Sequence, residues 1–409
     1  MYLKTKILLL IFCLSIFCTK IFSQQDSLKL ISKDSSKPLR IAVLLPLYID
    51  SAFDNYDYKL QENFIPQYIL TGLDFYNGVM LAIDSLQKEG INCEVHIYDT
   101  KKKDATTNSL VDEMKPLNFS LIIASFNNAA EQKILSDFSF NNNIPLISAT
   151  YPNDAGITSN PFFIMLNSTL KTHVEGIYKY ASLNYPNKKI LFITKQGFLE
   201  DKIKNIFLSC NQQNHFLKYN VITLTDNFLP ANLLPLMDST KSNVLICGSF
   251  NEDFGVKLIQ TIGAAKAYNA TVVGMPDWDA IKAFDENECK GVEIIYSTPY
   301  RFYRNDSVGM AVATLYKTTW FAKPSDMVFK GFEIMYHFTH LLMQYKTDFI
   351  NHLSDTSFTI ANKFFIKPVK RSAAVANSAS FVPDYLENKT LYFVKNLNGK
   401  IMAINKLPD

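Results

Sequence analysis

The chain has 409 residues, 48% of them hydrophobic and 19% charged, so it is long enough for two globular domains. Its formal net charge is +3, but Lys4, Lys6 and Lys20 lie in an N-terminal segment that we expect to be removed. The remaining chain is close to neutral and has no basic block, which argues against nucleic acid or an anionic membrane surface as a partner.

Residues 1–23 have the three parts of a secretory signal peptide, and a polar leader follows at 24–37. In chain order the parts are Lys4 and Lys6, the apolar run 7–17, and Ile21 and Ser23 before a cleavage site at Gln24. The apolar run is shorter than the roughly 20 residues that span a bilayer, and no later stretch is long enough, so we expect an exported protein that is not integral to a membrane. The alternatives are an uncleaved anchor and a lipid anchor on Cys18, although Phe17 stands where a small residue should precede a lipidated cysteine.

Four cysteines follow the signal peptide, at positions 93, 210, 247 and 289, without the spacing of metal ligands. Cys93 and Cys247 lie in apolar, strand-like runs, where a buried free thiol is the usual state. A disulfide is the alternative, because an exported protein meets an oxidising compartment.

From residue 39 onward, predicted strands and helices alternate. Apolar runs predict strands at 39–47, 93–98, 120–124, 144–147, 162–166, 189–194, 219–223, 243–247, 271–273 and 291–297. Helical spacing predicts helices at 71–89, 105–115, 129–140, after 166 through 183, 199–210, 230–238, 251–266, 307–321 and 326–346. We expect Thr71 to cap the first helix in a capping box with Asp74, and Asn398-Gly399 to turn a C-terminal hairpin.

This alternation predicts an α/β fold made of βαβ units with parallel sheets. There are too many strands for one sheet, so we expect two Rossmann-like lobes joined by crossover strands. The predicted division is lobe 1 at 38–161 plus 298–380, lobe 2 at 162–297, and a C-terminal β-hairpin region at 381–409.

The sequence lacks the common catalytic signatures: a phosphate-binding glycine loop, a metalloprotease helix and a nucleophile elbow. His337 and His340 share a helix, but they flank its apolar stripe without further ligands, so packing is preferred over a metal site. Asp277 and Asp279 are a candidate acid–base pair, with helix capping as the preferred interpretation. We therefore predict no enzyme activity, no cofactor and no metal.

Small polar residues follow several strands at their carboxyl ends, where parallel sheets bind ligands. They are Ser125, Asn127 and Asn128, then Ser148, Ala149 and Thr150, then Ser249 and Asn251. Their hydroxyls and the nearby helix-terminal amides suit a ligand carboxylate. Helix capping is the alternative, because Ser and Asn are preferred caps.

The order of these segments resembles the type I periplasmic binding proteins, in particular the leucine and branched-chain amino-acid-binding branch. The segments that carry the resemblance are LRIAVLLPL (39–47), TGLDFYNGVMLAID (71–84), YDT (98–100), SLIIASFNNA (120–129), NIPLISAT (143–150), NPFFIML (160–166) and KILFIT (189–194). GMPDWDAI (274–281) and FKGFEIMYHF (329–338) are similar to a version of the domain in Bacteroidetes-type envelope proteins.

The resemblance implies two lobes that close on a small polar ligand such as an amino acid. It implies that Ser125, Ser148, Ala149 and Thr150 bind the ligand's carboxylate. It also implies an acid from the second lobe for the ammonium group, either Asp253 or Asp277, and cleft walls from Tyr300 and Phe198.

The segment 48–70 departs from that family as a long, aromatic-rich insertion. It is expected to fill the cleft, act as a lid or bind a partner protein. The leading hypothesis is a periplasmic solute-binding protein that delivers a small-molecule ligand to an ABC permease. The alternative is an envelope interaction module on the same fold, similar to activators of cell-wall synthases, and a third hypothesis is a hydrolase that uses Asp277 and Asp279.

Overall fold

The first strand, β1 (Leu39–Leu45), is apolar except at Arg40, and its last five residues are completely buried. Such a strand suits the middle of a sheet covered on both faces. The computed structural model describes residues 38–60, 64–211, 217–301, 307–371 and 382–404. The predicted signal peptide, the polar leader and Cys18 lie outside these residues.

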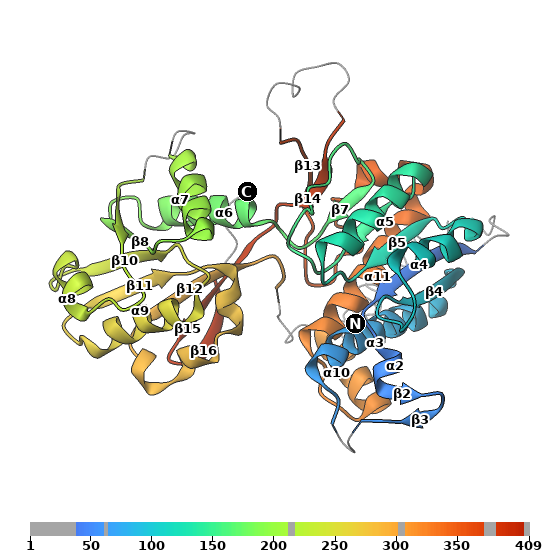
Figure 1. Ribbon diagram of the computed structural model, residues 1–409, viewed down its shortest axis with the longest axis horizontal. Helices are drawn as coiled ribbons and strands as arrows, with labels where there is room; N and C mark the ends of the chain where they lie inside the picture. The colour runs from blue at the N-terminus through green and yellow to red at the C-terminus, as the bar shows by residue number, and fades with distance from the viewer. Residues whose placement is uncertain (1–37, 61–63, 212–216, 302–306, 372–381, 405–409) are drawn as a thin grey trace, which may run out of the picture. The chain divides into compact units, whose positions relative to one another are not determined.

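β1 belongs to a sheet of seven strands in the order β13-β14-β7-β6-β5-β1-β4. Figure 1 labels β13, β14, β7, β5 and β4 of this sheet. All of its neighbouring strands pair in parallel except β13, which is antiparallel to β14. The other strands are β4 (Cys93–Asp99), β5 (Leu121–Ala124), β6 (Leu146–Ser148), β7 (Phe163–Met165), β13 (Ile366–Val369) and β14 (Tyr385–Asn388). We call this sheet and the helices that pack on it lobe 1.

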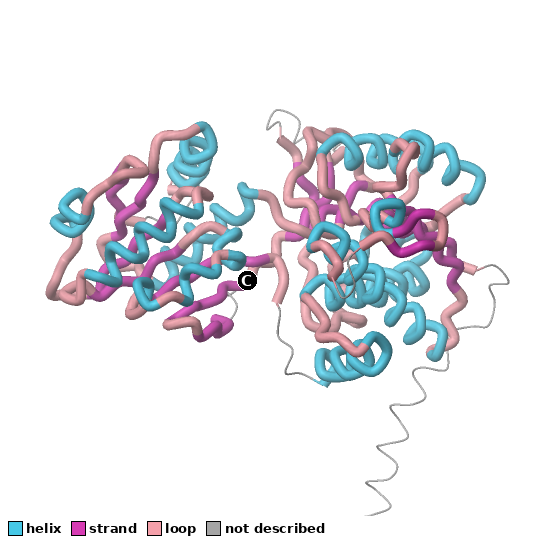
Figure 2. Tube along the Cα trace, turned by 60° about the horizontal axis from the view of Figure 1, so that its bottom comes forward, coloured by secondary structure: helices cyan, strands magenta, loops and turns pink. Residues whose placement is uncertain are grey.

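Helices cover both faces of the lobe 1 sheet, as Figure 2 shows. Ile41 and Val43 face one apolar cluster with α3 and α11, whereas Ala42 and Leu44 face another with α4 and α5. The alternation follows from the two-residue period of a strand. The helices of lobe 1 are α2 (Ile49–Ala52), α3 (Gln67–Lys88), α4 (Thr107–Met114), α5 (Ala129–Asn142), α10 (Ser307–Trp320) and α11 (Asp326–Tyr345), with 3-10 turns η2 (Lys115–Leu117) and η7 (Lys346–His352).

The contact between α3 and α11 depends on glycine. A Cβ atom on Gly78 would lie 2.0 Å from the carbonyl oxygen of Val328, and one on Gly331 would lie 2.2 Å from that of Phe75. Each helix therefore brings a glycine against the backbone of the other helix. The predicted start of α3 was wrong: the helix begins at Gln67, after Pro66, so Thr71 lies inside it and bonds back to the Gln67 carbonyl.

The capping box predicted for α3 is also absent. Asp74 is buried inside the helix and accepts a hydrogen bond from the Tyr316 hydroxyl of α10 at 2.9 Å. The sequence pattern was misleading because Thr and Asp at this spacing also occur within helices when tertiary contacts satisfy the acid. Asp74 thus links two helices that are far apart in the chain.

The second sheet also has seven strands, in the order β16-β15-β12-β11-β10-β8-β9. The five strands β9, β8, β10, β11 and β12 are parallel, and β15 and β16 follow as antiparallel neighbours. The strands are β8 (Ile190–Thr194), β9 (Tyr219–Thr223), β10 (Ser242–Cys247), β11 (Asn269–Val273), β12 (Glu293–Thr298), β15 (Tyr392–Leu397) and β16 (Lys400–Ile404). We call this sheet and its helices lobe 2.

One apolar cluster forms the core of lobe 2, with side chains from the sheet and from α6, α7 and α9. The helices are α6 (Leu170–Asn184), α7 (Phe198–Cys210), α8 (Pro230–Leu233) and α9 (Glu252–Ala264), with 3-10 turns η3 (Leu234–Leu236), η4 (Pro276–Ala280), η5 (Lys282–Asp285) and η6 (Asn287–Cys289). The hairpin predicted at Asn398-Gly399 is present, because β15 pairs with β16 and both turn residues have positive φ angles.

Sheet membership differs from the predicted division at two places. β7 pairs with β6 and β14, so the strand predicted at 162–166 to open lobe 2 is part of the lobe 1 sheet. The segment expected as a separate hairpin region supplies β14 to the first sheet and β15 and β16 to the second. The chain consequently crosses between the sheets three times: after β7, after β12 and after β14.

The described cysteines are free thiols. Cys247 is fully buried in β10, as predicted, and burial raises the pKa of its thiol to about 12. Cys93 is only half-buried, contrary to the prediction, because β4 is the edge strand of its sheet.

Candidate functional site

The carboxyl ends of β5 and β6 bring the predicted ligand residues of lobe 1 together. Ser125 follows β5 and Thr150 follows β6, and their hydroxyl oxygens are 3.0 Å apart. Thr150 is half-buried, and its hydroxyl also lies 3.3 Å from the Phe126 carbonyl oxygen. Adjacent parallel strands end at the same edge of a sheet, so this pair follows directly from the strand order.

Ser148, the last residue of β6, and Ala149, which follows it, are fully buried. The Ser148 hydroxyl donates to Gln132 Oε1 of α5 at 3.0 Å. The Ala149 N–H donates to the Ala124 carbonyl at 2.9 Å, and its own carbonyl accepts from the Tyr300 hydroxyl at 2.7 Å. The bonds of Ser148 and Ala149 are thus made within lobe 1, and Thr150 is the one of the three that is partly exposed to solvent.

Tyr300 is buried rather than placed on a cleft wall. Its side chain is 1% exposed, and the ammonium of the half-buried Lys330 lies 4.3 Å from its ring centre. Burial raises the pKa of Tyr300 and lowers that of Lys330 to about 8. Through its bond to Ala149, Tyr300 ties the crossing after β12 to the loop that carries Thr150.

Several residues that the sequence analysis missed shape the same edge. The Asp99 carboxylate, at the end of β4, accepts backbone N–H bonds from residues 47, 48, 49 and 101 at 2.9–3.2 Å. This fixes Tyr48 in a left-handed conformation, with its hydroxyl 3.5 Å from Asn127 Nδ2. Asn167, after β7, donates to the Thr150 carbonyl at 2.6 Å. An acid at the end of a parallel strand, within the YDT segment, was the available signal.

The insertion begins at this edge and turns into α2 and a small hairpin of β2 (Phe53–Asp54) and β3 (Asp57–Tyr58). Seven of its described large side chains are solvent-exposed, with Tyr56 at 98%. The other exposed members are Ile49, Phe53, Tyr58, Phe64, Ile65 and Tyr68. Residues 61–63 lie outside the described part. We call this set the insertion patch.

In lobe 2, Asp277 stands out at the carboxyl end of β11. Its Oδ1 atom is buried and has no hydrogen-bond partner among the described residues. Desolvation is the main reason why its pKa rises to about 7. The neighbouring Trp278 is buried against Gly255 and Gly274, where a Cβ on Gly274 would lie 2.0 Å from the indole. The packing of the indole therefore fixes the loop that holds the Asp277 carboxyl group.

The other predicted residues of lobe 2 are placed differently. Asp253 is exposed in the first turn of α9, and Phe198, the first residue of α7, is 89% exposed. Asp277 is therefore the more sheltered of the two acids considered for an ammonium group.

Some strand-end residues serve the fold. Asn128 caps α5 and Asn251 caps α9, each by accepting a backbone N–H bond. The buried Ser249 hydroxyl donates to Glu200 Oε1 at 2.7 Å. Asn128 and Asn251 are therefore helix caps, a position for which asparagine is a preferred residue type.

The two histidines of α11 have unlike surroundings. His337 is fully buried and its ring lies 5.5 Å from that of Phe364, whereas His340 Nε2 is 2.9 Å from Glu89 Oε2. In the described part of the chain, His, Cys, Asp and Glu side chains form no group of three that could hold a metal ion. Both histidines are part of the packing of α11.

Asp277 and Asp279 are also unlike. Asp279 is exposed, whereas the Asp277 carboxyl group is largely desolvated. A glycosidase-type pair needs two carboxyl groups that flank one bond. The difference in burial gives that arrangement no support.

Comparison with known proteins identifies the fold of this chain. No protein-family profile matches the chain, and no curated protein sequence matches it. Solved structures do: a Rhodospirillum rubrum protein assigned to a branched-chain amino acid ABC transporter has a TM-score of 0.65 at 10% identity, covering 90% of this chain and 100% of that one. A Silicibacter pomeroyi protein with the same assignment has a TM-score of 0.59 at 16% identity, covering 91% and 97%. An ABC transporter substrate-binding protein from Desulfitobacterium hafniense in complex with Leu has a TM-score of 0.56 at 10% identity, covering 90% and 100%.

These similarities show the fold. The chain has the two-lobed α/β fold of the type I periplasmic binding proteins, with parallel sheets joined by crossover segments, as the sequence predicted. Within the described residues, no helix combines the length and the apolar character needed to cross a lipid bilayer.

Proposed function

We propose that this protein is an exported, non-catalytic solute-binding protein that captures a small polar ligand, such as an amino acid, by closing its two lobes. The observation that carries the proposal is a pair of unlike polar groups at the carboxyl edges of the two sheets. Lobe 1 offers the Ser125 and Thr150 hydroxyls, and lobe 2 offers the desolvated carboxyl group of Asp277. Ligands of parallel sheets bind at this edge.

The proposed roles follow from charge. The hydroxyls of Ser125 and Thr150 bind the ligand's carboxylate, and the buried Ser148 and Ala149 precede Thr150 in the chain. The Asp277 carboxylate binds the ammonium group, which would lower its raised pKa by supplying the missing opposite charge. A ligand complex among the similar structures, the Desulfitobacterium hafniense protein with Leu, supports this class of ligand.

The proposed location is the periplasm, because the chain starts with a predicted signal peptide. The proposed partner is the permease of an ABC transporter, as the assignments of the similar structures suggest. A lipid anchor on Cys18 is the alternative to a freely diffusing protein.

Thermal unfolding in the presence of single amino acids and short peptides tests the proposal. A ligand at a hundred times its Kd should stabilise the protein by about 2.7 kcal/mol and raise its melting temperature. Asp277→Asn should weaken that ligand at least tenfold, because losing one partner of a buried charge pair costs about 2–5 kcal/mol.

Asp279→Asn is the matched control, since it removes an exposed acid two residues away. If both variants bind equally well, Asp277 is not the ammonium partner. If no amino acid or peptide shifts the melting temperature, small-ligand capture is refuted for these classes.

The insertion patch favours a second candidate function, an interaction with another envelope protein. Seven large apolar side chains on one short segment are an unusual exposure for a soluble surface. Replacing Tyr56 and Phe64 by Ala should abolish capture of such a partner without altering the melting temperature. Partner capture that survives these changes would exclude the patch as its binding site.

A further inference from the structure

Two of the three crossings leave lobe 1 side by side. β7 and β14 are parallel neighbours, with Leu386 opposite Ile164 and Glu387 opposite Met165. β7 leads into α6 and β14 leads into β15, both in lobe 2. Bending between the lobes therefore has to be absorbed in part by these two adjacent segments.

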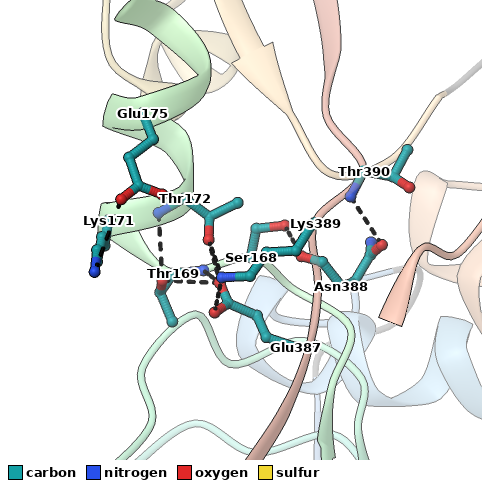
Figure 3. Close-up of polar contacts among 9 residues, drawn as sticks. All are labelled: Ser168, Thr169, Lys171, Thr172, Glu175, Glu387, Asn388, Lys389 and Thr390. Atoms are coloured by element: carbon teal, nitrogen blue, oxygen red, sulfur yellow. Dashed lines mark hydrogen bonds and ion pairs between the residues drawn. The ribbon is translucent and has the colours of Figure 1, made fainter. Parts of the chain in front are cut away.

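The carboxylate of Glu387 lies between these crossings (Figure 3). Its Oε1 atom accepts hydrogen bonds from the Thr169 N–H at 2.8 Å, the Thr169 hydroxyl at 2.8 Å and the Thr172 hydroxyl at 2.7 Å. Its Oε2 atom accepts from Lys389 Nζ at 2.6 Å, and the same ammonium donates to Thr172 Oγ1 at 2.8 Å. The side chain of Glu387 thus binds the start of α6 and the segment after β14 at once.

Asn388, which is fully buried, makes a second tie at the same place. Its carbonyl accepts from the Ser168 hydroxyl at 2.8 Å, and its Nδ2 donates to the Leu166 carbonyl at 3.2 Å. Its Oδ1 accepts from the backbone N–H groups of Phe365 and Thr390, both at 3.1 Å. Each polar group of this side chain is used, so the crossing after β7 and the crossing after β14 share one network.

Because Glu387 is buried, its carboxylate needs every partner in this network. The residue is 1% exposed, and a buried carboxylate is tolerated only when hydrogen bonds and an opposite charge compensate its lost hydration. Here the compensation comes from both crossings, and the N-terminus of α6 adds a favourable dipole. Moving one crossing away from the other would remove hydrogen-bond partners from the Glu387 carboxylate.

The crossing after β12 is held by a different acid. The Arg301 N–H donates to Asn362 Oδ1 at 2.5 Å, and Asn362 Nδ2 donates to Glu333 Oε2 of α11 at 2.5 Å. The two anchoring acids, Glu333 and Glu387, lie on different elements of lobe 1. Lys363, next to Asn362, donates its N–H to the Tyr392 hydroxyl at 3.0 Å, so this second anchor also reaches the crossing after β14.

We propose that Glu387 is a positioning residue of the hinge: by binding the first turn of α6 together with Lys389, it makes the crossings after β7 and β14 bend as one unit. The effect of this hinge on ligand capture rests on the proposed function. A hinge that samples fewer conformations keeps a larger fraction of molecules competent to bind, and apparent affinity scales with that fraction.

Distance measurement between spin labels tests this inference on the full secreted chain without any ligand. Labels are placed on exposed positions of each lobe, Lys88→Cys in α3 and Lys202→Cys in α7, with Cys93 and Cys210 changed to Ser. Glu387→Gln should broaden the distribution of distances between the labels. Exchange of the backbone amides at 169–173 and at 387–390 should rise together by roughly tenfold or more, as expected for losing hydrogen bonds to a charged group.

Glu175→Gln is the matched control, because Glu175 pairs with Lys171 on the surface of the same helix at 3.8 Å (Figure 3). It should leave both measurements as in the unmodified chain. If Glu387→Gln speeds exchange only at 169–173 and leaves the distances unchanged, Glu387 is merely a helix cap and the inference is overturned.

Thr172→Val is the milder variant if Glu387→Gln does not fold. It removes one hydroxyl from the network, and it should broaden the distances less but in the same direction. An unchanged distribution in Thr172→Val would also overturn the inference. If no ligand is found, the distance and exchange results still test the hinge. If the protein binds a ligand but Glu387→Gln leaves the distribution of label distances unchanged, the hinge inference is refuted and the proposed function is not.

Discussion

Acid should destabilise this protein through buried histidines, and His337 offers the cleanest test. Its side chain is fully buried, neither ring nitrogen bonds to another side chain among the described residues, and the Phe358 backbone is the polar group beside the ring. Two aromatic rings lie beside it, with Phe338 at 4.9 Å and Phe364 at 5.5 Å between ring centres, and Asp355 and His340 are its titratable neighbours. Desolvation is the main reason why its pKa falls from 6.5 to about 4.

The direction of the change in stability with pH follows from where protons bind more readily. A histidine with a lowered pKa in the folded protein binds protons more readily when the chain is unfolded, so stability falls as the pH drops from about 6.5 toward 4. Between pH 7 and pH 5, His337 should cost about 2 kcal/mol of unfolding free energy. His173, which is also buried and has a pKa of about 4, should add a similar amount.

Urea unfolding at pH 7 and pH 5 measures the effect. His337→Leu should lose about 2 kcal/mol less than the unmodified protein over this range. It should remain folded at pH 7, because leucine suits the apolar surroundings formed by Phe338 and Phe364. His352→Gln is the control, since that ring is partly exposed and stacked on Tyr345. Equal losses in His337→Leu and the unmodified protein would refute the reasoning.

Two further predictions concern packing and thiols. Gly78→Ala would stabilise an isolated helix by about 1 kcal/mol. In this protein it should lower the melting temperature, because overpacking against the Val328 carbonyl costs about 1–3 kcal/mol. An unchanged melting temperature would mean that α3 and α11 separate freely. The described thiols should react slowly with a disulfide reagent at pH 8, because burial raises the pKa of Cys210 and Cys289 to about 11 and that of Cys247 to about 12. After denaturation without reductant, the same thiols should react rapidly. In the chain without residues 1–23, which keeps four of the six cysteines, fewer than four reactive thiols after denaturation would indicate a disulfide.

Local patterns predicted most of the strands and helices, because continuous apolar runs and helical spacing reflect burial directly. They failed where the decisive contact is distant. α3 starts before Thr71 because residues 67–70 pack as a first turn, and Asp74 finds its partner in Tyr316. The sheet that β7 joins depends on β6 and β14, which no property of a three-residue strand reveals.

The candidate site divides in the same way. The meeting of Ser125 and Thr150 was predictable, since both follow neighbouring strands of a parallel sheet. The burial of Tyr300 was not, because it depends on how the chain re-enters lobe 1 after β12. The raised pKa of Asp277 likewise depends on the fixed loop around Trp278, a three-dimensional property without a sequence signature.

The placement of β14, β15 and β16 has a consequence for biogenesis. These strands follow all the others in the chain, yet one completes the pairing between β7 and β13 and the other two extend the sheet beyond β12. A nascent polypeptide synthesised only as far as residue 381 therefore has both sheets unfinished. Until the last residues are made, β7 and β12 each lack a neighbouring strand, so both lobes reach their final pairing only when the C-terminal segment joins them.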